Sequence, residues 1–180
     1  MRDPILRRSV LAGAGLALTL LVAGCGTTDT ALDTQPAFYA NLAKTGKPVD
    51  VAAAASLLSD YRTGRGLSPL TPDEQLNKIA QDQANAMARA DNLSHEVGGR
   101  NFMTRIKASG YNASKAVENV GAGYHTLAEA FSGWRDSPSH NKNMLEAGVS
   151  RMGIATANAP NSKYKVYWAL VLAQPDSAGR

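Results

Sequence analysis

Histidines and nearby serines are the side chains in this sequence with the clearest capacity for chemistry. The three histidines are His95, His125 and His140. Ser137 and Ser139 stand close to His140, which is the combination that a serine nucleophile with a histidine base requires. However, Ser137 begins a Ser-Pro turn, and the chain contains no Gly-x-Ser-x-Gly motif to present a nucleophile. We therefore do not expect serine catalysis.

The single cysteine, Cys25, follows a pattern typical of export. Residues 1–9 carry three arginines, and residues 10–24 carry no charge. This apolar run is shorter than the roughly 20 residues that a membrane-spanning helix needs, so we interpret residues 1–24 as a signal peptide. Val22-Ala23-Gly24-Cys25 resembles the lipobox of bacterial lipoproteins. The alternative is an ordinary signal peptide followed by an incidental cysteine.

The lipobox resemblance implies cleavage before Cys25 and acylation of its sulfur and its new amino group. Two or three acyl chains hold a protein stably at a membrane, whereas one is marginal. We therefore expect an exported lipoprotein of a bacterial cell envelope, anchored through Cys25. Gly26 rather than an aspartate follows the cysteine, which points to the outer membrane if the cell has one.

The composition excludes several other classes of protein. Hydrophobic residues make up 44% of the 180 residues and charged residues 19%, which is enough for a folded core. The net charge of +4 is too small, and too concentrated near the N-terminus, to predict a nucleic-acid partner. One cysteine cannot form an internal disulfide or a multi-cysteine zinc site.

The first half of the exported chain predicts a tether followed by helices. We assign residues 25–48 to the lipidated cysteine and a small, polar tether, with a short helical segment at 38–42 that docks on the domain. A helix is expected from Asp50 until a stop at 63–66. Its apolar stripe consists of Ala54, Leu57, Leu58 and Tyr61.

A second helix is predicted to begin at Thr71. Thr71 suits the N-cap, Pro72 suits the first helical position, and Glu74 completes a capping box. The side chains expected on its buried face are Leu76, Ile79, Ala80, Gln83, Ala84 and Met87.

Two further helices and a hairpin complete the prediction. Phe102 and Ile106 before Gly110 indicate a short helix, and Thr126 with Glu129 forms a second capping box, ahead of a stripe that includes Trp134. Residues 152–157 and 163–173 are rich in β-formers and are separated by a turn. Helices first and strands last predict an α+β fold with helices packed on a small antiparallel sheet.

Seven short pieces of sequence, in order, resemble one known family. The pieces are Leu57–Arg62, Gly66–Leu70, Ser94-His95, Glu118-Asn119-Val120, Trp134–His140, Met152-Gly153-Ile154 and Tyr167-Trp168. Together they resemble the bacterial branch of the CAP superfamily. This superfamily includes cysteine-rich secretory proteins, plant pathogenesis-related proteins of class 1 and allergen-type venom antigens. The resemblance implies an α-β-α sandwich over residues 49–175.

The same resemblance implies a surface cleft lined by two histidines and two glutamates. Carried over position by position, His95, Glu118 and His140 occupy three of these places. The fourth falls on Ser137, so this chain has lost one carboxylate. His125 lies outside the pattern, and we interpret it as a histidine of a surface loop.

Three interpretations of the cleft remain open from the sequence. His95, Glu118 and His140 could bind Zn²⁺ with one open position, although Ser137 removes a candidate base for hydrolysis. They could equally form a hydrogen-bonded polar cluster that binds a lipid, a glycan or a protein without turnover, which is the interpretation we favour. The first alternative is a metal-dependent hydrolase of envelope polymer or peptide. The second is a structural envelope protein with a vestigial cleft.

Overall fold

The structure is a computed structural model, and it describes residues 36–176. The predicted signal peptide (1–24), Cys25 and the first part of the predicted tether lie outside these residues. In the part of the chain that is described, no helix is long and apolar enough to cross a membrane.

A four-stranded sheet forms the centre of the fold. Its strands are β1 (Thr71–Pro72), β2 (Ala113–Ala122), β3 (Arg151–Ala159) and β4 (Lys165–Pro175), in the order β1-β3-β4-β2. β3 and β4 form the predicted antiparallel hairpin, and β2 pairs antiparallel with β4. β1 pairs parallel with β3, so the sheet is mixed rather than wholly antiparallel. The strand β2 therefore forms one edge.

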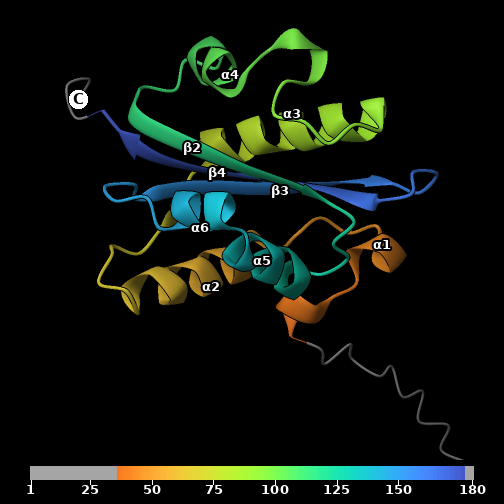
Figure 1. The fold of residues 1–180 in the computed structure, drawn as a ribbon, viewed down its shortest axis with the longest axis horizontal. Helices are drawn as coiled ribbons and strands as arrows, with labels where there is room; N and C mark the ends of the chain where they lie inside the picture. Colours follow the sequence, from red (N-terminus) through yellow and green to blue (C-terminus); the bar gives the residue numbers. More distant parts are fainter. Residues whose placement is uncertain (1–35, 177–180) are drawn as a thin grey trace, which may run out of the picture. The chain divides into compact units, whose positions relative to one another are not determined.

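Helices cover both faces of this sheet. They are η1 (Ala37–Tyr39), α1 (Leu42–Thr45), α2 (Val51–Thr63), α3 (Glu74–Ala90), η2 (Val97–Gly99), α4 (Phe102–Ala108), α5 (Leu127–Asp136) and α6 (Pro138–Met144). The helices α3 and α4 lie on one face, and α2, α5 and α6 lie on the other (Figure 1). The predicted α-β-α sandwich is confirmed.

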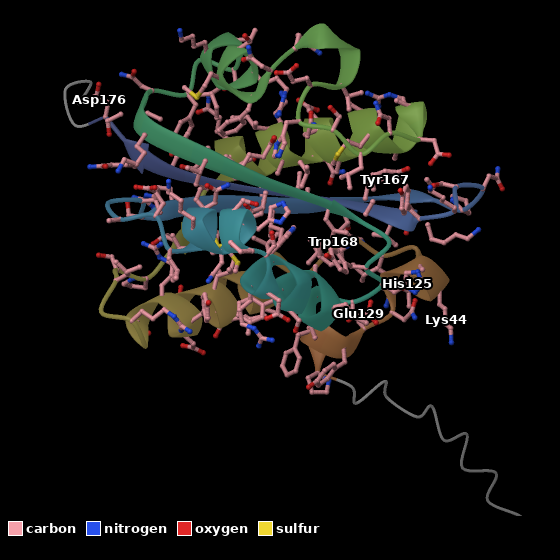
Figure 2. All side chains as sticks on the ribbon, viewed as in Figure 1. Lys44, His125, Glu129, Tyr167, Trp168 and Asp176 are labelled. Atoms are coloured by element: carbon pink, nitrogen blue, oxygen red, sulfur yellow. The ribbon has the colours of Figure 1, made fainter. Side chains whose placement is uncertain are left out.

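Strand β4 separates two hydrophobic cores because its side chains alternate between the faces. Consecutive residues such as Tyr167 and Trp168 therefore point to opposite sides (Figure 2). The core shared with α2, α5 and α6 receives Val166, Trp168, Leu170 and Leu172, and the core shared with α3 and α4 receives Tyr167, Ala169, Val171 and Ala173. Ala169, Val171 and Ala173 are each smaller than the preceding β4 residue, which faces the other side of the sheet, and this lets α3 approach the sheet closely. At Gly153 of β3, a Cβ atom would lie 2.1 Å from the backbone carbon of Leu76, so only glycine fits there.

The start of α3 differs from the prediction. The N-cap is Asp73, whose side chain accepts a hydrogen bond from the Leu76 amide at 3.0 Å. Thr71 instead donates its backbone amide to Ser150 as part of β1. Aspartate caps a helix as well as threonine does, so both residues are suitable N-caps. The pairing of Thr71 with β3 therefore decides that α3 begins after Asp73. The predicted buried face of α3 is confirmed at all six positions.

The other helix signals have mixed outcomes. The capping box of Thr126 and Glu129 is present at the start of α5, and α4 lies where it was predicted. Strand β2 and helix α6 were not predicted. Residues 137–138 were interpreted as a turn, because a Ser-Pro pair is typical of one. Proline is accepted at the first position of a helix, which is where Pro138 lies.

Arg62 changes the buried face of α2. The predicted stripe included Leu57 and Tyr61, which are only half-buried, whereas the Arg62 side chain is fully buried. Its guanidinium donates to four backbone carbonyls, those of Ser68, Met144, Glu146 and Val149, at 2.8–3.0 Å. These bonds replace the water that the charge loses on burial. They also fix the end of α6 to α2.

The predicted docking of residues 38–42 is confirmed, although the segment forms η1 and the start of α1 rather than one helix. Leu42 is buried in the core beneath the sheet. Its backbone amide donates to the His125 carbonyl at 2.8 Å. Packed structure therefore begins before residue 49.

Candidate functional site

Glu118 is a buried carboxylate at the centre of the candidate site. It lies on the edge strand β2, and its side chain is 1% exposed. Arg105 of α4 places Nη2 2.9 Å from one carboxylate oxygen and 2.8 Å from the other. The Arg105 side chain is 10% exposed. The buried carboxylate of Glu118 is therefore in direct contact with a positive charge.

His95 is attached to the same carboxylate. Its Nδ1 lies 2.8 Å from Oε1 of Glu118, and its side chain is 50% exposed. An ionised carboxylate only accepts hydrogen bonds, so Nδ1 must carry the proton. When the half-exposed ring is neutral, its other nitrogen, Nε2, is a hydrogen-bond acceptor.

The backbone around His95 is held by two further side chains. Gln83 of α3 donates from Nε2 to the Ser94 carbonyl at 2.6 Å, and Arg105 donates to the His95 carbonyl at 3.1 Å. Arg105 therefore fixes both partners of the His95–Glu118 pair. The loop after α3 is positioned by α3 and α4 together.

His140 approaches from the other face of the sheet. It lies on α6, and Asn119 of β2 donates to its backbone carbonyl at 3.0 Å. Burial, and secondly the positive charge of His95, lower the pKa of His140. His95 is therefore close enough to His140 to act on it electrostatically.

Asn143 and Trp134 cover this edge. Asn143 of α6 donates to the backbone carbonyl of Glu118 at 3.0 Å, and it also bonds the Asn119 side chain. Trp134 of α5 donates from Nε1 to the Val120 carbonyl at 3.3 Å. Both helices are therefore attached directly to the strand that carries Glu118.

Ser137 lies one helical turn before His140, as predicted, because it is the N-cap of α6. Its Oγ is 3.4 Å from the Oγ of Ser139. Between residues 36 and 176, no hydrogen bond joins it to His95, Glu118 or His140. Its role as a cleft residue stays a prediction.

The predicted zinc-ligand set does not fit this geometry. Across residues 36–176, no group of three His, Cys, Asp or Glu side chains is placed to hold a metal ion. The physical reason lies in Arg105, whose guanidinium contacts both oxygens of Glu118 and puts a positive charge where a cation would have to bind. At His95, Glu118 and His140 the geometry therefore favours a hydrogen-bonded polar cluster over a metal site.

Sequence reasoning missed Arg105, Gln83, Asn119 and Asn143 as parts of this cluster. Arg105 carried a usable signal, because it falls three residues after Phe102 on the helix face that also carries Ile106. A charged residue on a buried face implies a buried partner. The asparagines gave no comparable signal, since their bonds depend on the packing of α6 against β2.

His125 lies apart from this cluster. It precedes α5, where Figure 2 places it beside Glu129. Its backbone amide donates to Oε2 of Glu129 at 2.6 Å. It serves as a comparison residue for the two histidines at the edge of β2.

Comparisons with known proteins agree with the fold. The model of the CAP family, described as the cysteine-rich secretory protein family, matches residues 55–172. This chain belongs to the CAP family.

Its relatives include bacterial proteins. The uncharacterized protein YkwD of Bacillus subtilis is 29% identical over 116 residues, which are 61% of this chain and 45% of YkwD. The match thus spans less than half of that relative. An extracellular protein containing an SCP domain from Bacillus anthracis superposes with a TM-score of 0.60 at 20% identity, over 68% of this chain and 39% of the other. An outer surface protein of Borrelia burgdorferi gives a TM-score of 0.63 at 18% identity, over 72% of this chain and 98% of the other.

Proposed function

We propose that this chain is a lipid-anchored CAP-domain protein of the bacterial cell envelope that binds a polar ligand at His95, Glu118 and His140 without turning it over. The observation that carries this proposal is the double engagement of Glu118. Arg105 contacts both of its oxygens, and His95 contacts one of them. The carboxylate is thereby committed to orienting His95 and is not free to act as a base.

Binding accounts for this arrangement better than hydrolysis does. A metal-dependent hydrolase needs a cation to activate water. In the described part of the chain no metal-holding group of side chains is present, and Ser137 stands where the family pattern has a second carboxylate. The remaining polar groups can accept and donate hydrogen bonds, which is sufficient for recognition.

The chemistry of the exposed groups favours a glycan or a peptide over a lipid. The half-exposed imidazole of His95 can present an acceptor nitrogen, and the imidazole of His140 is partly buried. Hydroxyl and amide groups pair with imidazoles, whereas an acyl chain would leave them without partners. We therefore assign the ligand to the polar polymers of the cell envelope.

The proposed location rests on the N-terminal sequence and on the relatives. The Bacillus anthracis protein is described as extracellular and the Borrelia protein as an outer surface protein. The apolar run and Val22–Cys25 add a route of export and an acyl anchor on Cys25. The membrane is then a partner through the lipid, and nucleic acid is not.

The binding proposal is tested by co-sedimentation of the purified chain with bacterial cell-wall sacculi. Wild-type protein is expected in the pellet, and His95→Ala and His140→Ala are expected to shift into the supernatant. His125→Ala is the matched control and should pellet like wild type. Equal pelleting of all four proteins would overturn the proposal.

The absence of turnover needs its own measurement. Sacculi incubated with the protein should release no soluble sugar or peptide fragments beyond a buffer control. Release that His95→Ala abolishes would instead establish hydrolysis at this site.

A further inference from the structure

A hollow lies between α3 and α4, and the proposed function does not use it. Its volume is about 550 Å³, which is within the range of small-molecule sites. Its lining includes neither His95 nor Glu118 nor His140. Two of its lining residues are joined, because Gln75 of α3 donates from Nε2 to the Ser109 carbonyl at 2.8 Å.

The charges around this pocket are mainly positive. Lys78 from α3, Arg100 from the loop before α4 and Arg105 from α4 line it, together with one acidic residue, Asp82. Because Glu118 already pairs with Arg105, Lys78, Arg100 and Asp82 leave an uncompensated charge of +1 around the pocket. Basic side chains that converge on one hollow attract a counter-ion from solution.

Arg105 supplies the second, independent observation. Its side chain is nine-tenths buried, and only Nη2 is engaged by Glu118 and by the His95 carbonyl. The Nε and Nη1 atoms are buried and have no hydrogen-bond partner among residues 36–176. A buried guanidinium with unpaired N–H groups is costly, because these donors have lost water and gained nothing. Because these atoms are buried, an anion in the pocket would supply the acceptor that they lack once the Arg105 side chain turns toward it.

We propose that the pocket between α3 and α4 binds a small, hydroxylated organic anion of sugar size through Lys78, Arg100 and Arg105. The anionic group is a phosphate or a carboxylate, since guanidinium and ammonium groups pair with both. Asp82 accepts hydrogen bonds from the hydroxyl groups of the ligand. Ile79 and Ala108 give the pocket an apolar wall against which a sugar ring can lie.

This site is separate from the histidine cluster, but Arg105 belongs to both. An occupant of the pocket would compensate the charge on the same guanidinium that holds Glu118. Binding of an anion in the pocket should therefore change the environment of His95, because His95 and Arg105 share the Glu118 carboxylate.

The test is calorimetric titration of the purified full chain with three matched probes: glucose 6-phosphate, glucuronate and neutral glucose. At least one of the two anions should bind, with glucose far weaker, and affinity should fall as salt is raised. The double variant Lys78→Gln/Arg100→Gln should weaken anion binding about tenfold. Lys107→Gln, which removes an exposed cation of α4 outside the pocket, should bind like wild type.

The two anionic probes identify the charged group of the ligand. Binding of glucose 6-phosphate alone assigns a phosphate, and binding of glucuronate alone assigns a carboxylate. A nuclear magnetic resonance signal from the Nε–H of Arg105 should shift when that anion is added. Equal binding of glucose and both anions, or of wild type and the double variant, would overturn the proposal. So would anion binding that is lost in His95→Ala but kept in the double variant, since the anion would then occupy the histidine cluster.

Discussion

Arg105 and Glu118 form a buried ion pair in which one nitrogen, Nη2, contacts both carboxylate oxygens, at 2.9 and 2.8 Å. The pair joins α4 to the edge strand β2, and it also fixes the ring of His95 through the shared carboxylate. One short helix therefore supplies the cation that pairs with Glu118 and helps to fix the orientation of His95.

Arg105→Met should destabilise the protein by about 3–5 kcal/mol, because it removes one partner of a buried ion pair and leaves the Glu118 carboxyl group buried without its cation. The double variant Arg105→Met/Glu118→Leu should recover much of this loss. Urea denaturation followed by circular dichroism measures both values. Lys107→Met on the same helix is the control, and an Arg105→Met protein as stable as that control would contradict the ion-pair assignment.

Zinc should not bind in a way that depends on the edge histidines. The guanidinium beside Glu118 opposes a divalent cation, so Zn²⁺ titrations of wild type and His95→Ala should give the same heats. His125→Ala shows the contribution of an unrelated histidine. Tight binding of one Zn²⁺ that disappears only in His95→Ala would restore the metal interpretation.

Acid should destabilise the fold through His140. Burial and the charge of His95 lower its pKa below the usual 6.5, so the unfolded chain takes up this proton at higher pH than the folded chain. The free energy of unfolding should therefore fall as the pH drops through 6.5, until folded His140 is itself protonated. Chemical denaturation at several pH values measures this slope. His140→Gln should flatten it, His125→Gln should not, and an unchanged slope in His140→Gln would contradict the prediction.

Trp134→Ala should cost roughly 3–5 kcal/mol, because the side chain is 1% exposed and packs edge-on against Trp168. Trp134→Phe keeps an aromatic ring and loses the bond to the Val120 carbonyl, so it should be milder. Thermal and urea unfolding give the ranking. A loss below about 1 kcal/mol for the alanine variant would place the tryptophan outside the core.

Cys25→Ser should abolish acyl labelling and release the protein from membranes, since Cys25 is the only thiol in the chain. Metabolic labelling with a fatty-acid analogue and membrane fractionation measure the two effects. Ser94→Ala is a control that leaves the N-terminal sequence intact. A Cys25→Ser protein that stays in the membrane fraction with unchanged mass would rule out the lipid anchor.

The elements that sequence predicted well are those decided by neighbouring residues. The buried face of α3 follows from helical spacing, and the start of α5 follows from Thr126 and Glu129. Strand β2 was missed because its partner β4 lies about 50 residues away, and because Ala113–Ala122 contains few large β-formers. Long-range pairing of this kind leaves little trace in local sequence.

The candidate site was predicted only in part for a related reason. The family resemblance supplied His95, Glu118 and His140, and the hydrogen bond between His95 and Glu118 agrees with it. It did not supply Arg105, whose role depends on how α4 packs over β2. Arg105 is also the residue that argues against the metal interpretation. The types and spacing of possible metal ligands do not reveal that a guanidinium already occupies both oxygens of Glu118.

The capped edge of β2 restricts how any peptide could be recognised. Edge strands commonly accept an extended segment as an additional strand, through their outward-facing backbone groups. Here the carbonyls of Glu118 and Val120 already accept bonds from Asn143 and Trp134. β-augmentation is therefore blocked in the middle of this strand. A peptide that reaches His95 and His140 must therefore be recognised through its side chains rather than its backbone. For the same reason, a second copy of the chain cannot add a strand to the sheet there.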